Sequence, residues 1–202
     1  FHGGASGVDS GLAINVADSI LEGDSYGDEF GLAVSMAGDV NGDGYSDLVV
    51  GAPNSDIASS FSGRAYVFHG SASGLPSGVA SQVAAADLPG PGGSDYFGRA
   101  VSGAGDLNGD GYGDIVIGAF RAEGRGLAFV YQGSPSGVPG GSSMGTAQAI
   151  VGGDGTGDSV GESVAAAGDL NGDGALDVGE RLRRQPRRPA QPAVFRCRRA
   201  DR

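Results

Sequence analysis

The sequence predicts an all-β fold made of β-propeller blades, each with about four antiparallel strands. Three observations predict it. Similar segments recur about every 65 residues, the apolar runs are short, and 41 of the 202 residues are glycine. These apolar runs are rich in β-branched or aromatic residues and are bounded by Gly, Pro, Asn and Asp, which is typical of strands joined by tight turns. Four short strands per repeat indicate a propeller blade.

The elements follow in order along each repeat. The strands predicted are Ala33–Ala37, Leu48–Gly51, Arg64–His69 and one near Ile20, Val83 or Ile150. The first strand of each repeat consists of small residues, whereas the third carries aromatic residues such as Tyr66 and Phe129. Small side chains suit the point where blades converge on an axis, and aromatic side chains fill the wider gap farther out. Two stacked sheets with an incidental size gradient are the alternative.

The repeat divides the chain into five segments. Residues 1–23 end a truncated preceding blade, 24–90 and 91–153 are two full repeats, 154–178 begin a third, and 179–202 form an Arg-rich tail. We therefore expect the chain to be a fragment, with any signal sequence upstream of it. The third repeat breaks off inside a strand after Val178, which indicates a reading-frame shift. A genuine, disordered basic tail is the alternative.

Charge excludes one class of partner. Residues 1–177 carry a net charge of −18, and residues 178–202 carry +7. An acidic body of this kind does not bind nucleic acid through phosphates, which requires a positive surface. No apolar stretch is long enough to span a membrane. Cys197 is the only cysteine, so no disulfide forms within the chain.

An acidic loop with the pattern Asp-x-Asn-x-Asp-Gly-x-x-Asp occurs three times, at the same place in each repeat. Positions 1, 3, 5 and 9 offer side-chain oxygens, and position 7 offers a backbone carbonyl. The predicted metal ligands are Asp39, Asn41, Asp43, Tyr45 and Asp47; Asp106, Asn108, Asp110, Tyr112 and Asp114; and Asp169, Asn171, Asp173, Ala175 and Asp177. Oxygen donors without His or Cys favour calcium, one ion per loop and up to three in all.

The third loop also matches another calcium motif. Asp169 through Glu180 fits the EF-hand pattern, which ends in a coordinating Glu. The equivalent residues in the other two loops are Val50 and Ile117, which cannot coordinate a metal ion. Dockerin modules use the same loop at a much shorter spacing and follow it with a helix. Hairpin calcium loops therefore fit the sequence better than an EF-hand or a dockerin module. The alternative to a calcium site is an Asp/Asn/Gly-rich hairpin turn that binds no metal.

Two flanking motifs complete a family resemblance. Phe30-Gly31 and Phe97-Gly98 precede the loops, and Gly51-Ala52-Pro53 follows the first loop, so the chain resembles FG-GAP repeat proteins. The resemblance implies the seven-bladed propeller of integrin α-subunits and related secreted bacterial proteins, with calcium in the blade loops. It also implies an extracellular or cell-surface location and adhesion or recognition of a protein or glycan ligand. Val160 and Phe120 depart from the motif, and fewer than three units cannot close a ring.

No residue constellation indicates catalysis. His69 stands where Gln132 stands in the next repeat, so it is no general base, and the serines lie in turns without a partnering His. The sequence therefore predicts a calcium-binding adhesion or recognition module rather than an enzyme. Two alternatives stay open. One is a non-catalytic propeller appended to a secreted hydrolase such as a phospholipase, and the other is a structural spacer.

Overall fold

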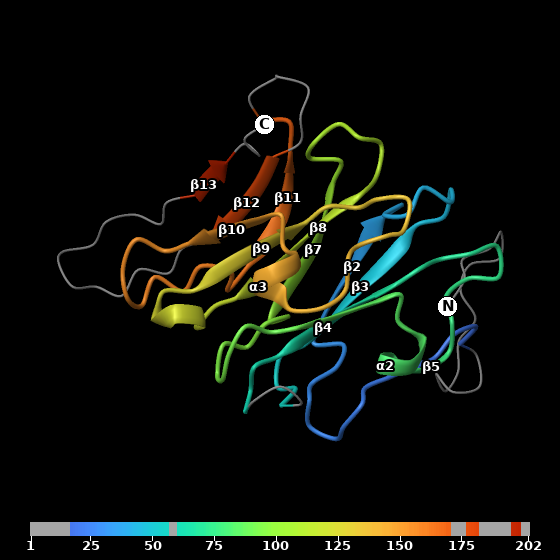
Figure 1. Ribbon diagram of the computed structural model, residues 1–202, viewed down its shortest axis with the longest axis horizontal. Helices are drawn as coiled ribbons and strands as arrows, with labels where there is room; N and C mark the ends of the chain where they lie inside the picture. The colour runs from blue at the N-terminus through green and yellow to red at the C-terminus, as the bar shows by residue number, and fades with distance from the viewer. Residues whose placement is uncertain (1–16, 57–59, 171–176, 182–194, 199–202) are drawn as a thin grey trace.

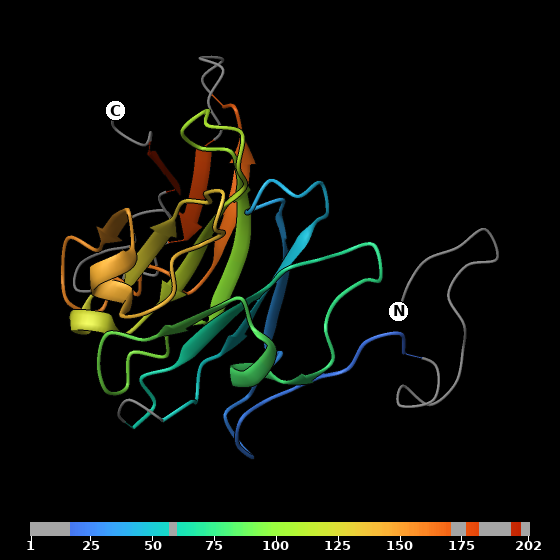
Figure 2. The same ribbon diagram turned by 45° about the vertical axis from the view of Figure 1, so that its right-hand side comes forward.

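The computed structural model describes residues 17–56, 60–170, 177–181 and 195–198. Three antiparallel sheets follow one another along the chain and lie side by side, with the second sheet between the first and the third (Figure 1, Figure 2). The sequential order of the sheets and the four-stranded form of the first two confirm the predicted all-β fold of propeller blades. None of the helices within the described residues has the length and apolarity needed to cross a bilayer.

The first sheet has the strand order β2-β3-β4-β6, and neighbouring strands are antiparallel. Its strands are β2 (Ala33–Gly38), β3 (Asp47–Ala52), β4 (Arg64–Phe68) and β6 (Ala86–Pro89). The prediction of a strand near Val83 is wrong, because Val83 ends the short helix α2 (Ala80–Val83). The fourth strand begins three residues later. In this strand Ala86 and Leu88 are buried and the residues that follow them are partly exposed. Such an alternation is typical of a strand with one face on the core.

The second sheet repeats the first in the order β10-β9-β8-β7. Its elements are β7 (Ala100–Gly105), β8 (Asp114–Ala119), η1 (Ala122–Gly124), β9 (Leu127–Tyr131), α3 (Ser143–Thr146) and β10 (Ala149–Gly152). A bulge after Met36 in the first sheet recurs after Gly103 in the second. The strand predicted near Ile150 is confirmed as β10.

The third sheet and one small strand pair complete the described structure. Its strands β11 (Val164–Gly168), β12 (Asp177–Arg181) and β13 (Phe195–Arg198) pair in that order, so the last strand comes from the Arg-rich tail. Near the first sheet, β1 (Leu21–Glu22) runs parallel to β5 (Gly78–Val79). The predicted strand near Ile20 corresponds to β1.

Side-chain size follows the predicted gradient across the sheets. The aromatic residues of the third strands, Tyr66, Phe68, Phe129 and Tyr131, are all fully buried. The inner strands β2, β7 and β11 lie beside one another and carry mostly small residues. A hydroxyl links each inner strand to the next, because Ser35 Oγ accepts the Gly103 N–H at 3.2 Å and Ser102 Oγ accepts the Ala166 N–H at 3.3 Å.

Glycine permits the close approach of adjacent sheets. A Cβ on Gly51 would lie 1.9 Å from the carbonyl oxygen of Gly98, and a Cβ on Gly118 would lie 1.9 Å from that of Gly161. These pairs join the Gly of the Gly-Ala-Pro motif in one sheet to the Gly of the Phe-Gly motif in the next. Backbone therefore packs directly on backbone, which only glycine allows.

Candidate functional site: the acidic loops and the opposite loop end

The first two acidic loops connect β2 to β3 and β7 to β8. Both project at the same end of the sheets, as Figure 2 shows for the blue and light-green hairpins. Of the third loop, Asp169 and Asp177 are described, whereas the predicted ligands Asn171, Asp173 and Ala175 lie outside the described residues.

Side-chain oxygens converge inside the first loop. Asp39 Oδ1 accepts the N–H of Gly42 at 2.7 Å and of Asp43 at 3.1 Å, and Asp39 Oδ2 accepts the Gly44 N–H at 2.8 Å. Asn41 Oδ1 accepts the same Asp43 N–H at 3.0 Å. Gly42 and Gly44 have φ of 76° and 89°, which lets the chain wrap around these oxygens. Oxygens from positions 1 and 3 therefore lie around one backbone amide.

The second loop has the same arrangement. Asp106 Oδ1 accepts the N–H of Gly109 at 2.7 Å and of Asp110 at 3.1 Å, and Asn108 Oδ1 accepts the Asp110 N–H at 2.9 Å. Asp110 Oδ1 accepts the Tyr112 N–H at 3.0 Å, as Asp43 Oδ1 accepts that of Tyr45 at 2.9 Å. The nine-residue pattern thus determines one local structure in both repeats.

The last Asp of each loop lies on the protein side of the loop. Asp47 is 2% exposed; its Oδ2 accepts the Val40 N–H and its Oδ1 accepts the Gly70 N–H, both at 2.8 Å. Asp114 makes the equivalent bonds to Leu107 and Gly133. In the third loop, Asp177 Oδ2 accepts the Leu170 N–H at 2.9 Å. Position 9 therefore braces the loop against the strands, a role that the sequence did not reveal.

The pKa shifts of a buried and an exposed carboxylate of the loops have opposite directions. Burial raises the pKa of Asp114 to about 6, although hydrogen bonds from the Leu107 and Gly133 amides oppose this shift. In the exposed part of the first loop, the hydrogen bond from the Asn41 side chain, followed by that from the Tyr45 amide, lowers the pKa of Asp43. Asp43 therefore carries a full negative charge over a wide pH range.

The carboxylates of the acidic loops are not arranged as a preformed metal site. Among the residues that the structure describes, no three Asp, Glu, His or Cys side chains are grouped closely enough to hold a metal ion. The reason lies in the bonds above, since the oxygens of positions 1, 5 and 9 each accept backbone N–H groups. The donor set itself consists of carboxylate and amide oxygens on a tightly turned loop, which is the chemistry that calcium prefers.

Another repeated Asp was missed by the sequence analysis. Asp28 lies two residues before Phe30 and accepts the Ser25 N–H at 3.1 Å, and Asp158 accepts the Gly155 N–H at 2.8 Å in the equivalent turn. Asp95 occupies this position in the middle repeat. The signal was present, because all three repeats carry Asp two residues before the Phe-Gly position. The residue that follows this Asp has a positive φ in each case: Glu29, Tyr96 and Ser159.

An aromatic stack lies in the loops at the opposite end of the strands from the acidic loops. Phe61 and Tyr96 stack with their ring centroids 5.9 Å apart, and Phe120 lies 5.4 Å from Tyr96. The guanidinium of Arg121 lies 5.0 Å from the Tyr96 ring centroid. Phe61 is 45% exposed, and it and Tyr96 have φ of 52° and 56°, so both adopt a left-handed backbone that bulky residues rarely adopt.

Comparison with known proteins identifies the repeats. The FG-GAP repeat family matches residues 30–68 and 97–131. Integrin alpha-PS5 of Drosophila melanogaster is 38% identical over 112 residues, which is 55% of this chain and 10% of the relative. Human integrin alpha-10 is 41% identical over 90 residues, or 45% of this chain and 7% of the relative. Integrin alpha pat-2 of Caenorhabditis elegans is 38% identical over 100 residues, or 50% and 8%. The chain thus spans about a tenth or less of the length of these relatives, and two of its segments match the FG-GAP repeat family and fold as blades of a β-propeller.

Proposed function

We propose that this chain is a calcium-stabilised, non-catalytic propeller module for adhesion or ligand recognition in an extracellular or cell-surface protein. The observation that carries the proposal is the repetition of one oxygen-lined loop at the same place in successive blades. In both fully described loops, Asp and Asn oxygens surround a single backbone amide. The similarity to integrin α-subunits supports the adhesion role.

Calcium would be held by the side-chain and carbonyl oxygens of each loop. In the first loop these belong to Asp39, Asn41 and Asp43, together with the Tyr45 carbonyl and an oxygen of Asp47. The cation would replace several N–H groups as the partner of these oxygens and would join the two ends of the loop. We expect dissociation constants on the order of 10⁻⁴–10⁻³ M, as in other extracellular calcium modules.

Ligand recognition would occur at the opposite loop end. The aromatic stack of Phe61, Tyr96 and Phe120 offers partly exposed rings on rigid turns, a common composition for surfaces that bind proteins or glycans. Calcium at one end of the blades would then stabilise the strands that present this surface at the other. The observation favours recognition over a purely structural spacer.

The test is a calcium titration followed by thermal unfolding. Calcium at about 100 times the dissociation constant should stabilise the chain by roughly 2.7 kcal/mol per site. The double variant Asp43→Ala with Asp110→Ala should lose most of this response. Magnesium serves as the control cation and should have a weaker effect, because these loops do not offer it a strict octahedron. An unchanged calcium response in the double variant would show that the loops are not the sites.

Ligand recognition needs its own measurement. Binding of the wild-type chain to arrays of extracellular-matrix proteins and glycans should be compared with that of Phe61→Ser. A calcium-dependent signal that this variant loses supports recognition through the aromatic stack. Equal binding by the variant places recognition elsewhere, and a complete lack of calcium-dependent signals favours the spacer.

A further inference from the structure

The first two acidic loops touch each other across the boundary between their sheets. A Cβ added to Gly42 of the first loop would lie 2.7 Å from Cε1 of Tyr112 in the second, so the Tyr112 ring lies directly against the Gly42 backbone. The next residue of the second loop, Gly113, donates its N–H to the Asp39 carbonyl at 2.7 Å. Two consecutive residues of the second loop therefore rest on the first loop.

The residues in contact belong to the oxygen donor sets of the two loops or are bonded to them. Tyr112 occupies position 7 of the second loop, where its backbone carbonyl is a proposed ligand. Asp39 occupies position 1 of the first loop, and its Oδ1 accepts the Gly42 N–H at 2.7 Å. The Tyr112–Gly113 segment is therefore positioned by the part of the first loop that closes around the Asp39 carboxylate.

A second connection between the loops runs through the buried aspartates at position 9. Asp47 Oδ2 accepts the Val40 N–H at 2.8 Å, and the Val40 carbonyl accepts the Ser134 N–H at 3.0 Å. The preceding residue, Gly133, donates its N–H to Asp114 Oδ1, also at 3.0 Å. Consecutive hydrogen bonds through the backbone therefore join the position 9 carboxylate of one loop to that of the next.

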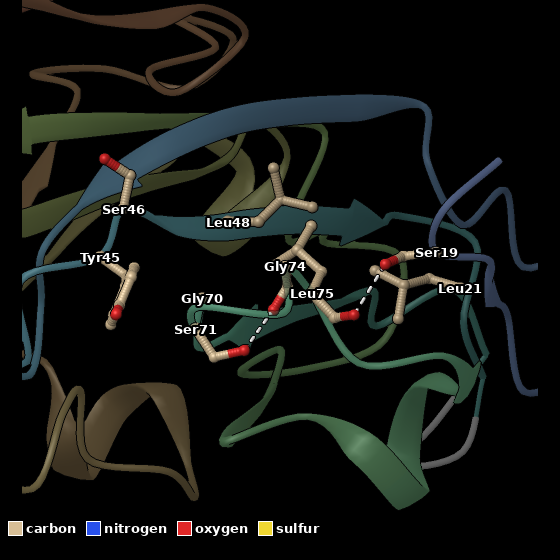
Figure 3. A pocket seen from close by; sticks show the side chains of 9 residues that line it. All are labelled: Ser19, Leu21, Tyr45, Ser46, Leu48, Gly70, Ser71, Gly74 and Leu75. Atoms are coloured by element: carbon tan, nitrogen blue, oxygen red, sulfur yellow. Dashed lines mark hydrogen bonds between the residues drawn. The ribbon is translucent and has the colours of Figure 1, made fainter. Parts of the chain in front are cut away.

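Close backbone packing makes this connection stiff. A Cβ on Gly133 would lie 2.7 Å from the Val40 carbonyl oxygen of the first loop and 2.8 Å from the Tyr112 Cβ of the second. The first loop rests on the turn of its own sheet in the same way, because a Cβ on Gly70 would lie 2.3 Å from the Ser46 carbonyl oxygen (Figure 3). A shift in the backbone of either loop is therefore transmitted to the other.

We propose that calcium binding at the first and second acidic loops is positively coupled, so that either loop binds more tightly when the other is filled. This inference rests on the proposed calcium function of the loops. In a filled first loop, Asp39 and Gly42 are fixed, and they in turn fix the Tyr112–Gly113 segment of the second loop. Ordering that segment then costs less when the second loop binds its cation. Linkage makes the effect reciprocal between the two loops.

Calcium titrations of the 202-residue chain, followed by amide NMR, measure binding at each loop separately. Two glycine amides in each loop donate to the Asp at position 1 and report on that loop: Gly42 and Gly44 in the first, Gly109 and Gly111 in the second. Asp43→Ala, which alters the first loop, should weaken calcium binding at the second loop by about fivefold or more. Asp110→Ala should weaken binding at the first loop by a similar factor.

Two variants of Tyr112 provide a matched control. Tyr112→Ala and Tyr112→Phe both keep the position 7 carbonyl, but only Tyr112→Phe keeps a ring against Gly42. Adding Asp43→Ala should weaken the second loop in Tyr112→Phe as it does in the wild type, and much less in Tyr112→Ala. The missing charge of Asp43 lowers the attraction for a cation equally in both backgrounds, so the comparison separates coupling through the contact from an effect of charge.

The outcomes distinguish the coupling from the calcium function on which it rests. Suppose that both loops respond to calcium, but Asp43→Ala leaves the affinity of the second loop unchanged or weakens it equally in the two Tyr112 backgrounds. The coupling is then overturned, whereas the calcium function stands. A wild type in which neither loop responds to calcium overturns both. The same spectra show whether each variant is folded, and the reciprocal Asp110→Ala measurement tests the coupling without any change at Tyr112.

Discussion

The backbone N–H of Val40 donates a 2.8 Å hydrogen bond to Oδ2 of Asp47, which ties the start of the first acidic loop to its end. The other oxygen of Asp47 accepts the Gly70 N–H, also at 2.8 Å. One buried carboxylate therefore holds the loop, the strand β3 that it begins and the turn after β4. The same bonds recur around Asp114.

We predict that Asp47→Ala destabilises the protein even when calcium is removed by a chelator. Two buried amides would lose their acceptor, at about 1–3 kcal/mol for each unsatisfied group. Urea denaturation in the chelator measures the loss. Asp43→Ala, in the exposed part of the same loop, should unfold at nearly the same urea concentration as the wild type. Equal losses in the two variants would contradict the bracing role of Asp47.

A second prediction concerns the two buried tyrosines of the third strands. Among the described residues, the Tyr131 hydroxyl is buried without a hydrogen-bond partner, and its counterpart in the first sheet is Phe68. Tyr131→Phe should therefore leave the free energy of unfolding unchanged or raise it by about 1 kcal/mol or more.

The matched variant is Tyr66→Phe. The Tyr66 hydroxyl donates to Asp24, which also accepts the Ser81 hydroxyl. Removing this donor should cost about 1 kcal/mol. Denaturant titrations should show a lower free energy of unfolding for Tyr66→Phe and an unchanged or higher one for Tyr131→Phe. A similar loss in both would mean that the Tyr131 hydroxyl has a partner in solution.

Backbone packing between sheets leads to a third prediction. Gly51→Ala and Gly118→Ala should each destabilise by about 3 kcal/mol or more, because the added Cβ would overlap a carbonyl oxygen of the next sheet. Gly145 lies in α3, where an added Cβ would come no nearer than 4.0 Å to the Cβ of Ser142, so Gly145→Ala should be neutral or mildly stabilising. Thermal unfolding of the three variants checks the order. A mild effect at Gly51 would show that the sheets separate easily.

The fourth prediction concerns a polar pair in the first sheet that apolar residues replace in the second. Arg64 and Asp87 form a 3.0 Å ion pair in the first sheet, where the second sheet has Leu127 and Ile150. Each single change, Arg64→Leu or Asp87→Ile, should destabilise, because the remaining group loses its partner. The double variant should regain most of the loss. A double-mutant cycle measured by urea denaturation gives the coupling, and additive losses would contradict it.

The same pair predicts a pH dependence. Burial raises the pKa of Asp87, and the charge of Arg64 opposes that shift. Without Arg64, the folded-state pKa rises further above the unfolded value, so the folded state favours the protonated acid more strongly. Arg64→Leu should therefore lose stability, relative to the wild type, as the pH rises from about 4 to 7. Arg64→Leu with Asp87→Ile should lack this additional slope.

The sequence by itself determined the repeat, the approximate places of most strands in each repeat and the positions of the acidic loops. Local patterns were sufficient there, because strand periodicity and turn residues act over a few residues. The nine-residue loop is such a local unit, and its first five positions fold alike in both described copies. The position of the fourth strand was harder to predict from the sequence, because Val83 and Leu88 are both apolar. Only pairing with β4 selects the residues from Ala86 onward as the strand.

Only the tertiary structure decided what each residue faces. Asp47 matches a ligand position of the loop pattern, and its burial against Gly70 gives it in addition a bracing role that the pattern does not encode. Likewise, Val40 and Leu170 occupy the same position in the pattern, yet one is seated in a neighbouring sheet and the other is exposed. Contacts between sheets join residues tens of positions apart, such as Gly51 and Gly98, and nothing in a local pattern encodes these pairings.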